Sequence, residues 1–294
     1  NSKAIRKRIK SVASTKKITR TMEMVATSKL QRTQGRVIQS RPYVEAMSGL
    51  MQKLSASAAS ARLLCRLFES ASPTKRVLVD VIPDNRGLGG GFNTNIVRKA
   101  REHIDVLENE GLEVTLAVAG KKGIAQLRFQ GYRIDQSRTD LSDNPGFDDA
   151  ESLAAPMLEA FLLRDVDRVD IVYADFQSAA KQPPVAQTLL PVGLATEPGE
   201  APPEEDVGAD VFIYEPSAQA ILEELGPAYV KNLMYRILLS SVASEQLARR
   251  VAMKNATDNA GEMERSLTRD YNKARQAAIT QEIAEIVGGV EALK

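Results

Sequence analysis

A glycine-rich segment is the part of this chain whose residue types could bind a phosphate group. It reads Asp-Asn-Arg-Gly-Leu-Gly-Gly-Gly-Phe-Asn-Thr over residues 84–94, after a β-branched run and before a helical pattern. Backbone N–H groups of such a turn can approach a phosphate closely. A G-x-G-x-x-G count from Gly87, however, places Phe92 at the last glycine, and no Walker A Gly-Lys-Ser/Thr follows. The favoured interpretation is a tight strand-to-helix turn with at least one left-handed glycine, and nucleotide binding is the alternative.

Side chains for other catalytic and metal sites are scarce. One histidine, His103, and one cysteine, Cys65, allow neither a Ser-His-Asp nor a Cys-His arrangement, and neither a cysteine zinc site nor an internal disulfide. The acids are numerous but scattered, with no convergent pair. We therefore expect no catalytic residue, no cofactor and no metal, and we expect His103 to be at the surface or half-buried. No run of 18 apolar residues is present, so we expect no transmembrane segment.

Both ends of the chain carry a long helical pattern in which apolar residues recur every three or four positions. In the first arm these are Ile5, Ile9, Val12, Ile18, Met22 and Val25, then Val37, Val44, Met47, Met51, Leu54 and Ala58. In the second arm the row is Val230, Leu233, Ile237, Ser240, Ser244, Leu247 and Val251, continued by Leu267, Tyr271, Ala274 and Ala278. Sustained spacing of this kind is typical of coiled coils, so we expect the two arms to pair antiparallel.

Proline and glycine mark the boundaries of these arms. Pro42 predicts a kink or short break in the first helix, because proline removes a backbone hydrogen bond. The second arm is expected to start near Pro216-Ser217 and to end near Val287, before Gly288-Gly289. The predicted domains are an N-terminal coiled-coil helix over 1–67, a central α/β domain over 68–215 and a C-terminal coiled-coil helix over 216–294.

The central segment alternates between short apolar strands and amphipathic helices. The strands are expected at Arg76–Ile82, Val114–Ala119, Tyr132–Ile134, Arg168–Ala174 and Gln187–Val192. The helices are expected at Asn93–Glu110 (capped by Asn93 or Thr94), Lys121–Gln130 and Ala150–Leu163, and a polar loop over 195–209. This alternation predicts an α/β fold with a Rossmann-like, mostly parallel sheet between the two long helices.

Charge is distributed unevenly along the chain. Residues 1–41 carry 12 Lys and Arg against one acid, whereas residues 42–230 carry 17 basic and 29 acidic groups. A basic arm on an acidic body predicts a partner with a negative surface, either nucleic acid or an acidic protein ring. The arm lacks the interleaved aromatic residues of single-strand binders, and Tyr43 is its nearest ring. A nucleic-acid-binding protein with a basic N-terminal arm is therefore an alternative, as is a coiled-coil scaffold.

Three segments resemble the gamma subunit of F-type ATP synthases. Residues 16–29 (KKITRTMEMVATSK) look like its N-terminal signature, and residues 84–95 (DNRGLGGGFNTN) resemble its glycine-rich central segment. Residues 244–259 (SEQLARRVAMKNATDN) and 271–283 (YNKARQAAITQEI) are similar to its C-terminal helix. The segments lie in order over nearly the whole chain, although the middle, from about residue 130 to 210, is similar only loosely.

The resemblance implies a rotary shaft with no catalytic residues of its own. In that family the terminal helices form an antiparallel coiled coil inside a ring of alpha and beta subunits. The globular part lies against the epsilon subunit and the c-subunit ring, and rotation couples proton flow to ATP synthesis. The implied partners are therefore these subunits and no nucleic acid. The implied location is the cytoplasmic face of the bacterial plasma membrane, with the matrix side of the mitochondrial inner membrane as the second choice.

The resemblance also implies which residues contact the beta subunits. Met22 matches the methionine that faces an acidic lever segment of beta, and the other implied contacts are Lys17, Arg20, Lys29, Arg249, Arg275, Gln276 and Thr280. Seam packing is the alternative for Met22.

Overall fold

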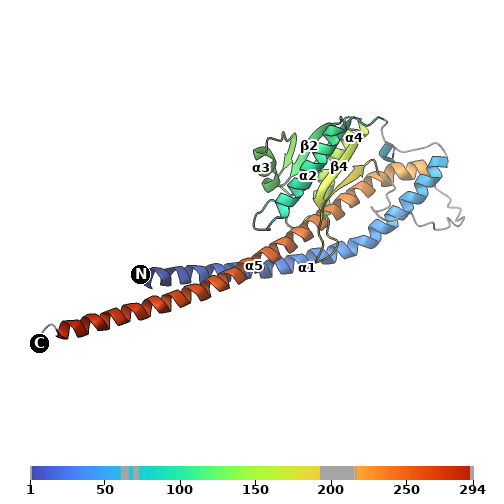
Figure 1. The fold of residues 1–294 in the computed structure, drawn as a ribbon. Helices are drawn as coiled ribbons and strands as arrows, with labels where there is room; N and C mark the ends of the chain where they lie inside the picture. Colours follow the sequence, from blue (N-terminus) through green and yellow to red (C-terminus); the bar gives the residue numbers. More distant parts are fainter. Residues whose placement is uncertain (1, 61–65, 69–72, 193–214, 216, 292–294) are drawn as a thin grey trace. The chain divides into compact units, whose positions relative to one another are not determined.

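The computed structural model describes residues 2–60, 66–68, 73–192, 215 and 217–291 (Figure 1). Helix α1 (Ser2–Ser60) and helix α5 (Ala218–Glu291) are the long terminal elements. The elements between them are η1 (Arg66–Phe68), β1 (Arg76–Val81), α2 (Phe92–Asn109), β2 (Glu113–Ala119), α3 (Lys121–Phe129), β3 (Gln136–Arg138), α4 (Phe147–Leu162), β4 (Arg168–Ala174) and β5 (Pro184–Leu190). The polar loop expected over 195–209 lies outside the described residues, as does Cys65.

Contacts divide the chain into two compact units. The helical unit contains Asn1–Ser28 and Arg249–Lys294, and the sheet unit contains Lys29–Ala248. Helices α1 and α5 both run without interruption from one unit into the other. These units are defined by contact and not by chain segment, so the division into 1–67, 68–215 and 216–294 stays a prediction.

The terminal helices are more continuous than their proline and glycine residues predicted. α1 stays helical through Pro42, so the expected short break is absent. The Pro42 side chain is exposed, and water can therefore satisfy the carbonyl that loses its partner. α5 continues through Gly288 and Gly289 to Glu291, past the predicted end at Val287. Glycine lowers the stability of a helix but does not by itself end it.

The sheet has the order β3-β2-β1-β4-β5, with β1, β2, β3 and β4 parallel. The predicted mostly parallel α/β sheet is confirmed. β5 pairs antiparallel with β4 at one edge, and it begins at Pro184, where a missing N–H costs no ladder bond. The predicted strand at 132–134 is wrong: the strand lies at Gln136–Arg138, where it pairs with β2.

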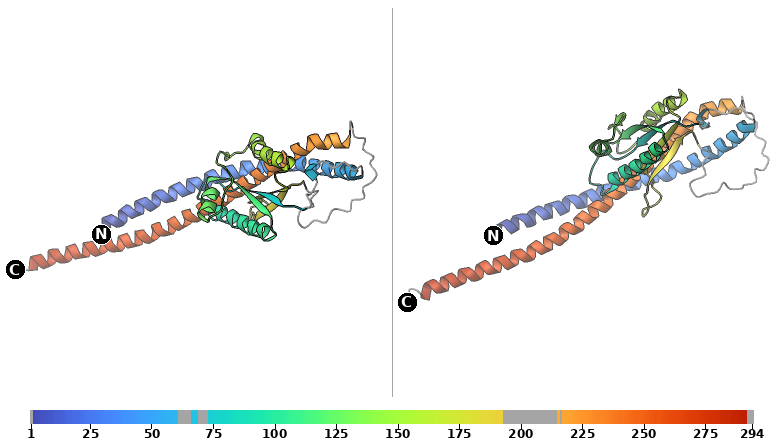
Figure 2. Two further views of the ribbon diagram at one scale, coloured as in Figure 1. Left: turned by 90° about the horizontal axis from the view of Figure 1, so that it is seen from above. Right: turned by 45° about the horizontal axis from the view of Figure 1, so that its top comes forward.

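Two helical layers cover the sheet (Figures 1 and 2). Val77, Val79 and Val81 of β1 face α2 and α3, whereas Leu78 faces the opposite side together with α4 and the first half of α5. Alternation along a strand thus divides the core into two clusters. α4 begins three residues before the predicted Ala150, because the Asp149 carboxylate accepts a 2.7 Å hydrogen bond from the backbone N–H of Gly146.

One acid lies inside this core. Asp80, in the middle of β1, is 1% exposed, and its Oδ2 has no hydrogen-bond partner among the described residues. Burial raises the pKa of Asp80 to about 7, although the positive charge of Arg138 and the backbone N–H of Val81 act in the opposite direction. A buried carboxyl group of this kind is held protonated by the cost of desolvating its charge.

Replacing Asp80 should change how folding stability depends on pH. The folded state binds the proton of Asp80 more tightly than the unfolded chain does, because the pKa rises from 3.8 to about 7 on folding. The stability that this proton contributes is therefore fully present below pH 3.8 and is lost as pH rises to about 7. Urea unfolding at pH 5 and pH 8 should show that Asp80→Asn gains stability relative to wild type at the higher pH. The gain is on the order of a few kcal/mol. An unchanged difference between the two proteins at both pH values would contradict the shifted pKa.

Candidate functional site

The glycine-rich turn joins β1 to α2 and satisfies its own polar groups. Asn93 Oδ1 accepts a 2.8 Å hydrogen bond from the backbone N–H of Asp84, and Asn93 Nδ2 donates to the Arg86 carbonyl at 3.2 Å. The predicted capping role of Asn93 or Thr94 is therefore wrong, because Gly91 occupies the N-cap without a side-chain hydrogen bond. Gly90 has φ 58°, which confirms that one glycine is left-handed.

Asn85 fixes this turn to its neighbours. Its Nδ2 donates to the Leu141 carbonyl at 3.1 Å, and its Oδ1 accepts a hydrogen bond from the backbone N–H of Lys121 at 3.0 Å. The backbone N–H of Phe92 is bonded to the Gly89 carbonyl at 3.2 Å, within the turn itself. These contacts explain the composition of the segment as a structural turn, which was the favoured interpretation.

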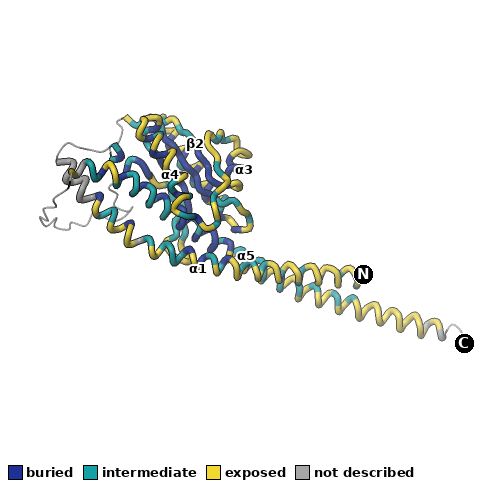
Figure 3. The backbone as a smooth tube through the Cα atoms, turned by 180° about the vertical axis from the view of Figure 1, so that it is seen from behind, coloured by how far each residue is buried: buried dark blue, intermediate teal, exposed yellow. Residues whose placement is uncertain are grey.

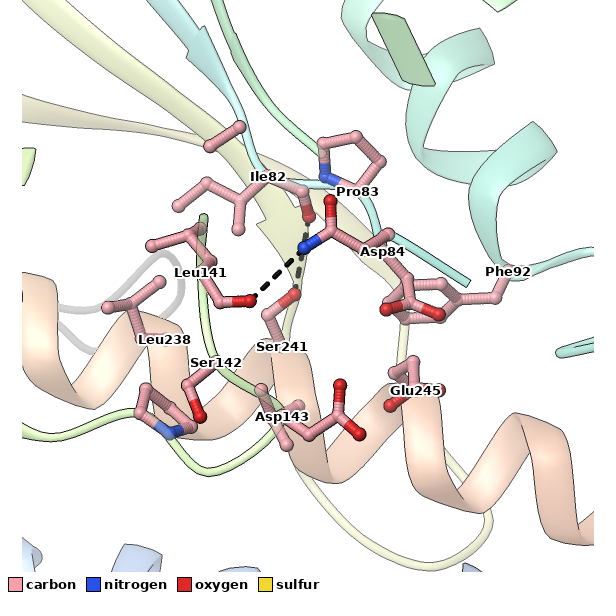
Figure 4. A pocket seen from close by; sticks show the side chains of 14 residues that line it. Ile82, Pro83, Asp84, Phe92, Leu141, Ser142, Asp143, Leu238, Ser241 and Glu245 are labelled. Carbon is pink, nitrogen blue, oxygen red and sulfur yellow. Dashed lines mark hydrogen bonds between the residues drawn. The ribbon is translucent and has the colours of Figure 1, made fainter. Parts of the chain in front are cut away.

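A small cavity lies between this turn and α5 (Figure 4). Its volume is about 40 Å³, and its polar lining includes Asp84, Asp143, Ser241 and Glu245. Such a volume holds ordered water but no nucleotide. No cluster of three or more His, Cys, Asp or Glu residues suited to a metal ion occurs in the described parts of the chain.

α5 is bonded to the ends of the central strands through three serines. Ser241 Oγ donates to the Ile82 carbonyl just beyond β1 at 3.3 Å, as Figure 4 shows, and Ser244 Oγ donates to the Ala174 carbonyl at the end of β4 at 3.2 Å. Ser240 Oγ accepts a 2.6 Å hydrogen bond from the backbone N–H of Phe176. Ser240 and Ser244 therefore bond to the end of β4 and the residues after it. The prediction that assigned them to a coiled-coil row did not include these contacts.

The helical unit pairs α1 with α5 in antiparallel orientation, as predicted. Lys16 Nζ lies 3.0 Å from Glu264 Oε2, and the hydroxyl groups of Thr19 and Thr257 are 2.8 Å apart. Partner numbers thus fall along α5 as they rise along α1, which defines the orientation. Ala26 is the most buried residue of α1 in this unit, at 1% exposed.

The predicted apolar row follows the contact between these two helices only in part, since Ile5, Ile9, Val12 and Met22 are half-buried. Ile18, Val25 and Val251 are 57%, 52% and 51% exposed, although the spacing placed all three in the row. Lys16 and Thr19, which contact α5, and the buried Ala26 are polar or small. Small side chains let two helices approach closely, whereas polar ones lower the hydrophobicity by which a seam is recognised.

The predicted contact residues are spread over both units. Lys17, Arg20, Arg275, Gln276 and Thr280 are exposed in the helical unit, where Met22 is half-buried and Arg249 is 7% exposed. Lys29 belongs to the sheet unit, and its Nζ lies 2.9 Å from Asp143 Oδ2. The structure therefore leaves five of these side chains accessible, and it engages Lys29 internally.

His103 is half-buried, as expected, and its Nε2 is 2.7 Å from Asp170 Oδ2. Arg168 and Thr188 also donate to this carboxylate, at 2.6 and 2.8 Å. Burial alone would raise the pKa of Asp170, but the hydrogen bonds from His103, Arg168 and Thr188 outweigh it and lower the pKa. The cluster stabilises the interface of α2 with the sheet, and sequence analysis missed it because its members are far apart in the chain.

Substitutions at Gly90 and Gly89 should separate backbone strain from crowding in the turn. Alanine at Gly90, with φ 58°, should lower the free energy of unfolding by about 1 kcal/mol. Alanine at Gly89 should be nearly neutral, because its Cβ would meet Phe92 Cβ at an ordinary 3.6 Å. Chemical unfolding of the two variants measures the difference, and equal losses would contradict this assignment.

Comparisons with known proteins match the chain over its whole length. The family model described as ATP synthase matches residues 1–293. An ATP synthase gamma chain of Gemmatimonas aurantiaca is 44% identical over 292 residues, covering 99% of this chain and 98% of that protein. The gamma chain of Leptospira biflexa is 42% identical, and the match covers 98% of this chain and 98% of that protein. The gamma chain of Frankia casuarinae is 41% identical, and the match covers 98% of this chain and 96% of that protein.

Solved structures agree with this result. The central stalk and c-ring structure of the Tetrahymena thermophila mitochondrial ATP synthase contains a chain that is 25% identical, with a TM-score of 0.58, covering 81% of this chain and 99% of that one. A Euglena gracilis mitochondrial ATP synthase chain, 20% identical, shares the fold with a TM-score of 0.64 over 99% of this chain and 94% of its own. The glycine-rich turn and the antiparallel terminal helices agree with these matches, which show that the chain belongs to the ATP synthase gamma-chain family.

Proposed function

We propose that this chain is the central rotor shaft of an F-type ATP synthase. It couples proton-driven rotation of the membrane ring to ATP synthesis or hydrolysis in the alpha/beta catalytic ring. The observation that carries this conclusion is the whole-chain family match, on a structure whose two ends pair antiparallel. As a gamma chain it is a non-catalytic subunit. A nucleic-acid-binding or purely scaffolding role is not favoured by these matches.

The partners follow from this role. They are the alpha and beta subunits, the epsilon subunit and the c-subunit ring, and no nucleic acid. Among the described helices none has the length and apolarity needed to cross a bilayer. The bacterial gamma chains among the relatives support a location at the cytoplasmic face of the plasma membrane, with the mitochondrial matrix side as the second choice.

The helical unit presents a surface suited to the beta subunits. Ile18, Met24 and Val25 are more than half exposed on α1, close in sequence to the exposed cations Lys17 and Arg20. Apolar side chains left exposed together are typical of a surface that is covered on assembly. The flanking cations would complement the acidic lever segment of beta that the family resemblance implies.

The set of residues that we propose to contact the beta subunits is smaller than the set implied by the family resemblance. Lys17, Arg20, Met22, Arg275, Gln276 and Thr280 are retained, since all but Met22 are exposed and Met22 is half-buried. Arg249 and Lys29 are removed, because Arg249 is buried and Lys29 is paired with Asp143. Figure 3 shows that α5 is mostly exposed along its C-terminal part, where Arg275, Gln276 and Thr280 lie.

Neutralising two cations of this surface should weaken assembly in a salt-dependent way. The double variant Lys17→Gln/Arg20→Gln should bind its alpha/beta ring up to about fivefold more weakly at low salt, and the difference should shrink at high salt. Binding can be measured by titrating labelled chain into the ring and following ATP hydrolysis. Arg128→Gln, an exposed cation of α3, is the matched control. Wild-type affinity of the double variant, with equal salt dependence, would count against the proposed contact surface.

A further inference from the structure

The part of α1 that belongs to the sheet unit has few fully buried apolar residues, although Met47 also packs against the core. Between Lys29 and Met51, the buried hydrophobic residues of α1 are Leu30, Val44 and Met51. In contrast, α5 contributes an almost continuous buried stretch from Ile237 to Leu247. Because hydrophobic attachment scales with buried apolar area, α1 depends more than α5 on polar contacts to hold its position.

A loop between β3 and α4 supplies these contacts. We call residues 141–146 the bridging loop. At its centre, Asp143 Oδ2 lies 2.9 Å from Lys29 Nζ of α1 and 2.7 Å from an Arg86 guanidinium nitrogen of the glycine-rich turn. The Asp143 side chain is 24% exposed, so these pairs are partly shielded from solvent. One carboxylate thus joins α1 to the turn that follows β1.

A second group of contacts lies two turns further along α1. The Arg36 guanidinium donates to Asn144 Oδ1 and to the Pro145 carbonyl in the bridging loop. It also donates to the Tyr235 hydroxyl of α5 at 2.7 Å, and the guanidinium carbon Cζ of Arg36 lies 5.7 Å from the Tyr235 ring centroid. The Tyr235 ring meets Phe147 edge-on at a centroid distance of 6.0 Å. The bridging loop thus contacts α1 through Arg36, and the first residue of α4 contacts α5 through Tyr235.

We infer that Lys29, Arg36 and Asp143 are positioning residues for rotary coupling, which fix α1 to α5 and to the sheet through the bridging loop. This inference deepens the proposed function and rests on it. It assigns Lys29 an internal partner in place of the beta subunit that the family resemblance implied.

The physical reason lies in how a load reaches α1. α1 is joined through the chain to β1 only by the segment after Ser60, which lies far from Lys29 in sequence. A torque applied to the sheet unit therefore acts on this part of α1 through side-chain contacts. Charged, geometrically defined contacts resist sliding along the helix axis better than a smooth apolar surface, since each slip separates opposite charges. Loss of the Asp143 charge would also leave Lys29 and Arg86 as neighbouring cations without their shared anion.

The test uses the assembled ATP synthase containing this chain, in sealed vesicles. ATP-driven proton pumping and ATP hydrolysis are measured in the same sample, and their ratio reports coupling. Asp143→Asn should lower this ratio about two- to fivefold, the range set by a partly exposed ion pair, while hydrolysis continues. Asp143→Glu should restore most of it. Asp165→Asn, which changes an exposed acid of the sheet unit that forms no ion pair with any residue the structure describes, should behave as wild type.

A double-mutant comparison identifies the partner of Lys29. If Lys29 acts through Asp143, Lys29→Gln should lower the ratio in the wild-type background and have little further effect in the Asp143→Asn background. Equal effects in both backgrounds would overturn the inference in favour of a contact outside this chain. A wild-type ratio in Asp143→Asn would overturn it as well, even if the melting temperature of the purified chain falls. If the wild-type complex itself shows no ATP-driven pumping, the proposed function fails and not the bridging loop.

Discussion

The attachment of α5 to the carboxyl edge of the sheet is the interaction on which the rest of this structure depends. Strands β1 and β4 end with carbonyl groups that the sheet does not pair, and Ser241 and Ser244 donate hydrogen bonds to the carbonyls there. The same stretch of α5 buries Met234 and Ile237 in the core shared with α4. Leaving such carbonyls buried without a partner would cost about 1–3 kcal/mol each. α5 is thus part of the sheet unit and, without a break, part of the helical unit.

The helical unit follows a different rule from the sheet unit. Polar contacts between Lys16 and Glu264 and between Thr19 and Thr257 join its helices, and its fully buried hydrophobic residues in the described part are Ala26, Met253 and Ala260. Partly exposed ion pairs contribute little to stability, so this pair of helices gains most of its support from what surrounds it. The exposed apolar side chains of Ile18 and Val25 are consistent with a shaft whose surface is covered by a surrounding ring of subunits.

Much of the fold could be predicted from the sequence because its signals are local. β-branched runs at residues 76–82 and 168–174 placed two central strands within one residue of their observed ends. The seam of the long helices could be read from spacing only in part. Lys16 and Thr19 continue the half-buried line of Ile5, Ile9 and Val12 with polar side chains, whereas the apolar Ile18 and Val25 are exposed. The internal partner of Lys29 was also beyond sequence reasoning, because Asp143 is 114 residues away and lies in a loop without regular periodicity.

Direct observation of rotation tests the central claim, that the sheet unit and the long helices turn together as one shaft. A particle can be attached to a single cysteine introduced at Phe129, which is 92% exposed on α3, after Cys65 is replaced by serine. With the alpha/beta ring fixed to a surface, addition of ATP should make the particle rotate in one direction at a rate that follows hydrolysis. A particle that stays still while the same complexes hydrolyse ATP would contradict the account.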